Sequence, residues 1–202
     1  MKYIVGEKGR MTQVFDESGI VHPATVLSVV PNAITQVKNI DKDGYSAVQV
    51  GYGTKKKINK PLSGHLKGKG SFRGLKEFRI ESEIPEEGAV IDVSIFEPGD
   101  VVSVSALSKG KGFQGVVKRY NFGGGPRTHG QKHTERAPGS IGGGGRAGGR
   151  VVKGQKMPGR MGQDRVTVKN LKVLQVNKEE GTIVIRGAIP GRPGTLVEIV
   201  SK

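Results

Sequence analysis

The sequence has no cysteine and no tryptophan, and only six Phe and four Tyr occur among its 202 residues. The absence of cysteine excludes disulfide bonds, thiolate zinc sites, iron–sulfur clusters and cysteine nucleophiles. No run reaches the roughly 18 apolar residues of a membrane-spanning helix. The first ten residues also lack the apolar stretch of a secretory signal peptide. Hydrophobic residues make up 34% of the chain, so we expect a small core.

Glycine and positive charge are what the sequence has in excess. Glycine supplies 33 residues, and 33 Lys and Arg stand against 18 Asp and Glu, which gives a formal net charge of +15. A charge of this size favours binding to polyanions, with nucleic acid first and an anionic membrane second.

The positive charge is concentrated in two segments. Residues 109–165 contain 13 Lys and Arg, two acidic residues and 17 of the 33 glycines. Residues 54–79 contain nine basic residues and one acidic residue, and the remaining 119 residues carry a net charge of −4. A mildly acidic body with two strongly basic segments indicates directed contact with a polyanion rather than a generally cationic surface.

The body has the pattern of a mainly β protein, because short apolar runs alternate with turn residues. We expect the N- and C-terminal strands to close a small β-barrel built from residues 1–53, 98–108 and 166–202. The apolar alternation changes phase at Asn170, which predicts a β-bulge. Residues 54–97 would form an inserted small α/β subdomain, basic and then acidic. Within it Phe72, Leu75 and Phe78 recur every three residues, which suggests one or two helical turns.

Residues 109–165 would form a long, irregular, glycine-rich basic extension. The glycine runs at 123–125 and 142–145 are incompatible with a regular helix or a central strand. Ordering about 40 backbone residues costs roughly 40–80 kcal/mol, and the stretch 120–162 has few apolar residues to offset that cost. Either it is disordered or an external partner orders it. Cations spaced along such a backbone could follow the phosphates of folded RNA.

The candidate RNA-binding residues are the basic side chains and two histidines of these segments. Those of the first segment are Lys55, Lys56, Lys57, Lys60, Lys67, Lys69 and Arg73. Those of the second segment are Lys109, Lys111, Lys118, Arg119, Arg127, His129, Lys132, His133, Arg136, Arg146, Arg150, Lys153, Lys156, Arg160 and Arg165.

Motifs for other chemistry have simpler explanations. The stretch 110–115 matches G-x-G-x-x-G, but no crossover helix and second strand follow it, so an RNA-facing turn is the better interpretation. His129 and His133 have a zinc-ligand spacing, but the Gly and Pro around them disfavour a helix. We expect no catalytic residue, no metal and no cofactor. Two alternatives are an architectural DNA-binding protein and an enzyme on a flavin-reductase-like barrel, which would lack a visible nucleophile or base.

Four stretches together resemble one known family over essentially the whole chain. They are Gly6–Phe15 with its Gly-Arg-Met-Thr-Gln-Val-Phe, Gly64–Arg79, Ser108–Arg119 with its Ser-Lys-Gly-Lys-Gly-Phe-Gln-Gly, and the central stretch 129–162 with its Arg-Ala-Pro-Gly-Ser-Ile-Gly. In these motifs and their order, the sequence is similar to the bacterial form of ribosomal protein L3.

The resemblance implies a fold and a function. The fold would be a six-stranded barrel like that of translation factors, with a long extension that enters ribosomal RNA and approaches the peptidyl-transferase region. The protein would be non-catalytic, would lie in the cytoplasm within the ribosome, and would bind large-subunit ribosomal RNA and neighbouring large-subunit proteins. It would act early in subunit assembly, with no membrane and no small-molecule substrate as partners.

Overall fold

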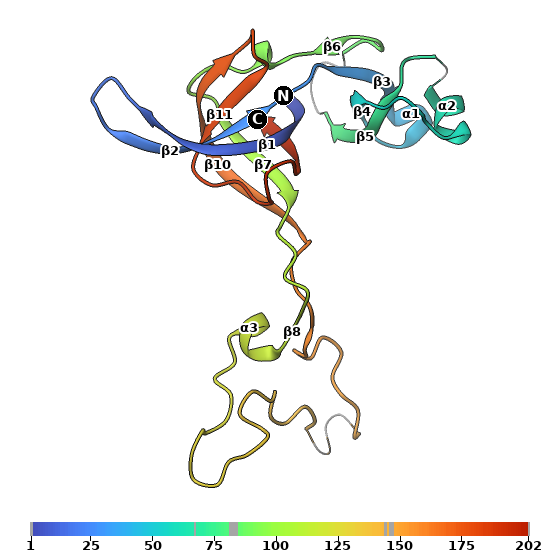
Figure 1. The fold of residues 1–202 in the computed structure, drawn as a ribbon. Helices are drawn as coiled ribbons and strands as arrows, with labels where there is room; N and C mark the ends of the chain where they lie inside the picture. Colours follow the sequence, from blue (N-terminus) through green and yellow to red (C-terminus); the bar gives the residue numbers. More distant parts are fainter. Residues whose placement is uncertain (1, 67, 81–84, 144, 146–147, 202) are drawn as a thin grey trace. The chain divides into compact units, whose positions relative to one another are not determined.

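The computed structural model describes residues 2–66, 68–80, 85–143, 145 and 148–201. The chain divides into two compact units (Figure 1), which we call the body unit and the extension unit. The body unit comprises Met1–Leu107 and Arg165–Lys202, and the extension unit comprises Ser108–Asp164.

Six antiparallel strands of the body unit close into a barrel. Their order around the barrel is β1 (Lys2–Phe15), β12 (Leu196–Ser201), β7 (Val101–Leu107), β10 (Arg165–Asn177), β11 (Thr182–Arg186) and β2 (Val21–Ser28), which pairs with β1 again. The N-terminal and C-terminal strands are therefore neighbours, with Lys2 opposite Ser201. The mainly β character predicted from the sequence is confirmed.

The barrel interior is filled by aliphatic side chains that alternate along the strands. Ile4, Leu27 and Ile199 are fully buried there, together with Phe96 from the connection before β7. This connection includes β6 (Val90–Ile91) and the 3-10 turn η1 (Val93–Ile95). The predicted bulge in β10 is confirmed, because its register against β7 shifts between Val168 and Leu171, and Asn170 has a positive φ of 58°.

A second sheet corrects the expected assignment of residues 1–53 to the barrel. The second half of that range forms β3 (Asn32–Lys38) and β4 (Ala47–Thr54), joined by one helical turn, α1 (Ile40–Asp43). These strands belong to a separate sheet of order β5-β4-β3-β6. The reason is a second core that packs against the outside of the barrel, in which Tyr3 of β1 stacks on Phe78 at 4.8 Å between ring centroids.

The predicted helical turns at Phe72, Leu75 and Phe78 are wrong, because this segment is strand β5 (Phe72–Arg79). The helix of the insertion is instead α2 (Lys60–Leu66). Between β4 and β5, an aromatic ring of each strand packs over a glycine of the other strand. A Cβ at Gly51 would lie 2.5 Å from Phe72 Cγ, and one at Gly74 would lie 2.4 Å from Tyr52 Oη. The glycines thus make room for the rings, and pairing with β4 outweighs the three-residue spacing.

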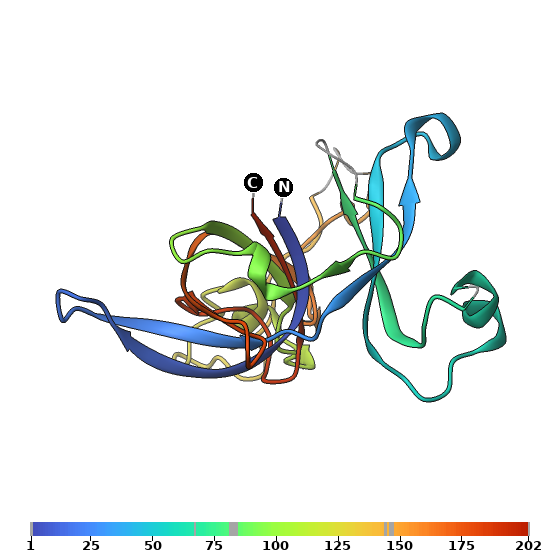
Figure 2. The same ribbon diagram turned by 90° about the horizontal axis from the view of Figure 1, so that it is seen from above.

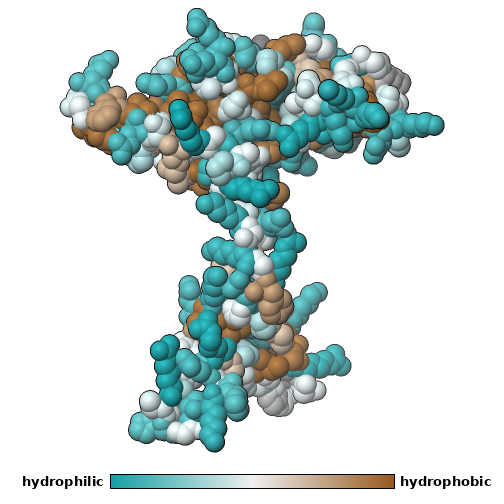
Figure 3. Space-filling model, viewed as in Figure 1, coloured by the Kyte–Doolittle hydropathy of each residue, from teal (hydrophilic) through white to brown (hydrophobic). Residues whose placement is uncertain are grey.

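The outer parts of β1 and β2 form a hairpin that extends beyond the barrel (Figures 1 and 2). Hydrophobic side chains lie along it on the face seen in Figure 3. The exposed ones include Met11, Phe15 and Ile20. Among the described residues, no helix is long and apolar enough to cross a bilayer.

The extension unit has little regular structure. It contains β8 (Phe113–Gln114), α3 (Val116–Tyr120) and β9 (Gly159–Arg160), and β8 and β9 pair in an antiparallel ribbon.

Candidate nucleic-acid interface

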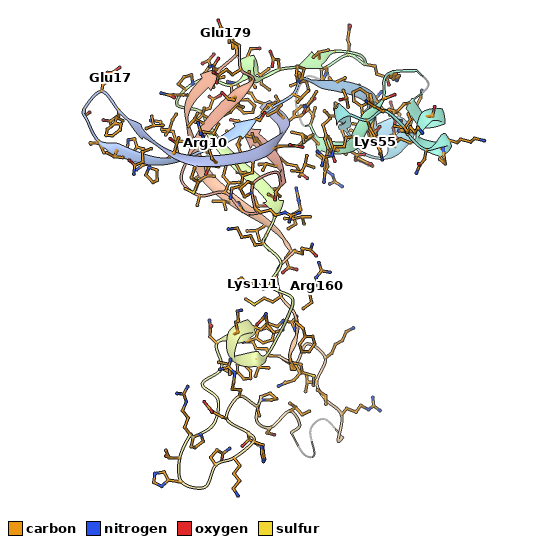
Figure 4. The ribbon with its side chains drawn as sticks, viewed as in Figure 1. Arg10, Glu17, Lys55, Lys111, Arg160 and Glu179 are labelled. Atoms are coloured by element: carbon orange, nitrogen blue, oxygen red, sulfur yellow. The ribbon has the colours of Figure 1, made fainter. Side chains whose placement is uncertain are left out.

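The β8–β9 ribbon is the paired β structure of the extension unit. Lys111 N donates to Met161 O, and Met161 N donates to Gly112 O, both at 2.9 Å. Gly162 allows the two segments to approach, because a Cβ there would lie 2.2 Å from Lys109 O, and its φ is +78°. Figure 4 shows Lys111 and Arg160 on the two paired segments of this ribbon. Two predicted RNA-binding cations are thereby brought together on a defined scaffold.

Arg119 has a structural role inside the extension unit. Its Nη1 donates to Met157 O at 2.8 Å. Its guanidinium lies 5.0 Å from the centroid of the Tyr120 ring, and Lys156 Nζ lies 5.7 Å from the same centroid. These contacts tie α3 to the segment before β9 and hold two cations on one aromatic ring.

The described part of residues 121–158 has no buried side chain. A turn is held where Gly125 N donates to Glu135 O at 2.8 Å. Arg127 Nε pairs with Glu135 Oε1 at 2.7 Å. The described part of the segment is thus built from local turns without a core, and its side chains are exposed or at most half-buried.

Most of the predicted cations of the extension unit are exposed. Hydrophilic side chains project from the visible face of this unit, with small hydrophobic patches between them (Figure 3). The exposed candidates are Lys109, Lys111, Lys118, Arg127, His129, Lys132, His133, Arg136, Arg150, Lys153, Lys156 and Arg160. Between described residues of this unit, the one charge pair is that of Arg127 with Glu135. Arg146 lies outside the described residues, as does Lys67 of the first basic segment.

The first basic segment is divided between free and paired cations. Lys55, Lys56 and Lys57 are exposed in the connection from β4 to α2, and Lys60 begins α2. Lys69 instead pairs with Glu87 at 2.7 Å. The ammonium group of Lys69 keeps the pKa of the Glu87 carboxyl below its ordinary value.

Arg73 and Arg165 also have carboxylate partners in the body unit. Arg73 pairs with Glu7. Arg165 and Lys76 both bind Glu198, at 2.5 and 2.7 Å. Burial disfavours the charged form of Glu198, but the two hydrogen bonds outweigh it and hold the pKa of this carboxyl below its ordinary value. These arginines are therefore partly neutralised, although each side chain is more than half exposed.

The metal interpretation of the histidines gains no support. Among the described residues, no group of three or more His, Cys, Asp and Glu side chains lies close enough to hold a metal ion. His129 has a left-handed backbone with φ of 57°, in a turn rather than a helix.

Two features of the basic surface are not evident from the sequence. Lys76 belongs to the Glu198 cluster, which the sequence could not indicate because the two residues lie far apart in the chain. Phe113 is 76% exposed and stands opposite Arg160 in the ribbon. The sequence could have drawn attention to Phe113, because it is the one aromatic residue within 109–119.

Comparisons with known proteins agree with the motif resemblance. The family model described as ribosomal protein L3 matches residues 73–192. The chain is 48% identical to the large ribosomal subunit protein uL3c of Phaeodactylum tricornutum, over 98% of this chain and 97% of that protein. It is 46% identical to the large ribosomal subunit protein uL3 of Herpetosiphon aurantiacus, over 97% of this chain and 94% of the relative. The chain belongs to the ribosomal protein L3 family.

Proposed function

We propose that this protein is a structural, non-enzymatic component of the large ribosomal subunit that binds large-subunit ribosomal RNA directly. Family membership supports the first part, since the relatives are named as large-subunit proteins. The distribution of charge supports the second part. Its place in the cell would be the ribosome in the cytoplasm.

The observation that carries the RNA proposal is the exposed, largely unpaired positive charge of the extension unit. Residues 108–164 contain 12 Lys and Arg and two acidic residues, and the described residues of 121–158 have no buried side chain. Ordering the backbone costs about 1–2 kcal/mol per residue, so phosphates that bind the cations would provide the missing stabilisation. Folded RNA, with its irregular backbone, fits a chain of local turns better than a regular duplex does.

The first basic segment would supply a second contact through Lys55, Lys56, Lys57 and Lys60, which are exposed. By family resemblance, the extension would approach the peptidyl-transferase region and the protein would act early in assembly. Peptide-bond chemistry would belong to the RNA, and the extension would support its surroundings. By the same family resemblance, we propose that the barrel is like those of translation factors.

Salt-dependent binding to purified large-subunit RNA tests the proposal. If about eight phosphates are contacted, the slope of log affinity against log salt concentration is near −6 to −7. A slope near −1 would reject it. A preference for duplex DNA in a competition assay would favour an architectural DNA-binding protein instead.

Matched charge variants locate the contact. Changing Lys118, Lys132 and Lys153 to Gln removes three exposed cations of the extension unit, and the slope should become about 2–3 units less steep. The same change at Lys42, Lys172 and Lys178, which are exposed in the body unit, alters the net charge equally and should change the slope by less than about one unit. Equal effects of the two sets would assign the contact to overall charge.

A further inference from the structure

The ribbon of the extension unit presents an aromatic ring that the protein itself leaves uncovered. Phe113 is 76% exposed, whereas Val116, three residues later, is 1% exposed. The unit therefore has an interior that accepts an apolar side chain, and Phe113 lies outside it. Among the described residues of 108–120 and 157–164, it is the one large hydrophobic side chain that is exposed to this degree.

Two cations neighbour Phe113 in the backbone of the ribbon, and one of them, Arg160, also donates from Nη2 to Gln163 Oε1. Arg160 is directly opposite Phe113 in the antiparallel pair, and side chains opposite each other project from the same face. Lys111 precedes Phe113 by two residues and is exposed. Arg and aromatic residues are enriched in protein–protein interfaces but Lys is depleted there, so Lys111 and the excess of 12 Lys and Arg over two acidic residues in 108–164 are what favour a polyanion.

The backbone around Phe113 leaves room for a flat ligand. A Cβ at Gly112 or at Gly115 would have no other atom within 4 Å. Gly112 also has a φ of +67°, a backbone conformation that residues with a side chain rarely adopt. The backbone before and after Phe113 is therefore uncrowded, and the ring itself is 76% exposed.

The ring also stands on a fixed support. The hydrogen bonds between Lys111 and Met161 and between Met161 and Gly112, each 2.9 Å long, flank the β8–β9 pair. Gln114 Nε2 additionally donates to Lys111 O. A side chain on a paired ribbon loses less freedom on binding than one in an open loop, so stacking on it is favoured.

We propose that Phe113 stacks on an unpaired nucleobase of large-subunit RNA, while Lys111 and Arg160 bind the phosphates beside that nucleotide. Aromatic side chains stack on the faces of unstacked bases in single-stranded loops and bulges of RNA. The inference rests on the proposed RNA-binding function and adds its ligand: a base displaced from a helix, rather than a regular duplex.

The absence of tryptophan provides a direct test. Phe113→Trp introduces the sole indole of the protein, and its emission should be quenched on titration with purified large-subunit RNA. Phe15→Trp is the matched control, because Phe15 is also exposed, at 65%, but is followed by Asp16 and Glu17. Its emission should not change. Unquenched emission from the Phe113→Trp variant, when that variant binds the RNA with the wild-type salt slope, would overturn the inference.

Affinity separates stacking from general hydrophobicity. Phe113→Leu keeps an apolar side chain without an aromatic face, and it should bind the RNA about 5- to 100-fold more weakly than wild type, whereas Phe113→Trp should bind as tightly or more tightly. Equal affinities of the Leu and Trp variants would reject stacking, as would quenching of the introduced indole by other large-subunit proteins but not by RNA. Amide exchange at Lys111 and Met161 checks that the ribbon is intact.

The outcomes distinguish this inference from the proposed function. If wild-type protein fails to bind large-subunit RNA with a steep salt dependence, both the proposed function and the stacking contact are rejected. If the salt dependence is steep, but the Phe113→Trp emission is not quenched and Phe113→Leu binds as tightly as wild type, only the stacking contact is rejected.

Discussion

Glu198 shows how a single carboxylate organises the basic residues of the body unit. Its side chain is 13% exposed and receives Lys76 from β5 and Arg165 from the first position of β10. It thereby joins the barrel to the second sheet at the residue where β10 begins. Because two cations share one partly buried partner, we expect Glu198 to contribute to folding more than an exposed pair would.

Glu198→Gln should lower the free energy of unfolding by about 1–2 kcal/mol near neutral pH. This loss is smaller than that expected for a fully buried ion pair, because Arg165 is 62% exposed and water screens its charge. The pKa of Glu198 in the folded protein lies below its ordinary 4.5. The stabilisation is therefore fully present above that value and is lost as the pH falls through the lowered pKa. Urea unfolding followed by circular dichroism should show the difference between wild type and variant shrinking below about pH 4.5.

Glu179→Gln is the control for this experiment. Glu179 projects from the turn between β10 and β11 (Figure 4) and has no cation partner among the described residues. Its variant should unfold within about 0.5 kcal/mol of wild type at neutral pH. A difference between wild type and Glu198→Gln that persists unchanged at pH 2–3 would show that the loss comes from packing rather than from charge.

At the scale of elements, the sequence predicted local pattern better than strand partners. The phase shift at Asn170 correctly predicted a bulge, because alternation reports which face of a strand is buried. The three-residue spacing of Phe72, Leu75 and Phe78 led to a wrong prediction of helical turns. Such spacing fits a helix, but Phe72 and Phe78, six residues apart, also lie on the same face of a strand. Nor does alternation specify which sheet a strand joins, so β3 and β4 were assigned to the barrel.

The candidate interface was predictable in composition but not in detail. Charge density alone identified the basic segments, since a concentration of Lys and Arg is a local property of the sequence. The partners that neutralise some of these cations are not local. Glu7 lies 66 residues from Arg73, and Glu198 lies 33 residues from Arg165. Only the fold brings these pairs together, and only the fold shows that Phe113 is left exposed.

Two glycines with the same backbone conformation test the construction of the β8–β9 ribbon. Gly162 and Gly154 have φ values of +78° and +86°, but a Cβ would clash with Lys109 O only at Gly162, since nothing lies within 4 Å at Gly154. Substitution by Ala costs about 1–2 kcal/mol of left-handed strain at each site. Gly162→Ala should additionally open the ribbon and accelerate amide exchange at Lys111 and Met161. Gly154→Ala should leave both rates unchanged, and similar rates in the two variants would contradict the close approach.

For the whole molecule, we expect the body unit to be stable by itself and the extension unit to be ordered by its RNA partner. The body unit has two hydrophobic clusters, one inside the barrel and one between β1 and the second sheet. The described residues of 121–158 have no buried side chain. Hydrophobic burial can therefore offset the entropy of ordering in the body but not in this stretch.

Hydrogen exchange on the complete protein tests this separation. Without RNA, amides of the barrel strands should exchange slowly, while most amides of 121–158 exchange almost at once, because few of their backbone groups are paired internally and water reaches them. Large-subunit RNA should slow exchange in 121–158 strongly and in the barrel little, since the phosphates order only the stretch that has no core of its own. Uniform protection of 121–158 in the free protein would contradict a partner-dependent extension. If amide exchange in 121–158 is unchanged in an RNA complex whose affinity depends steeply on salt, the main RNA contact would be assigned to the first basic segment, around Lys55 and Lys60.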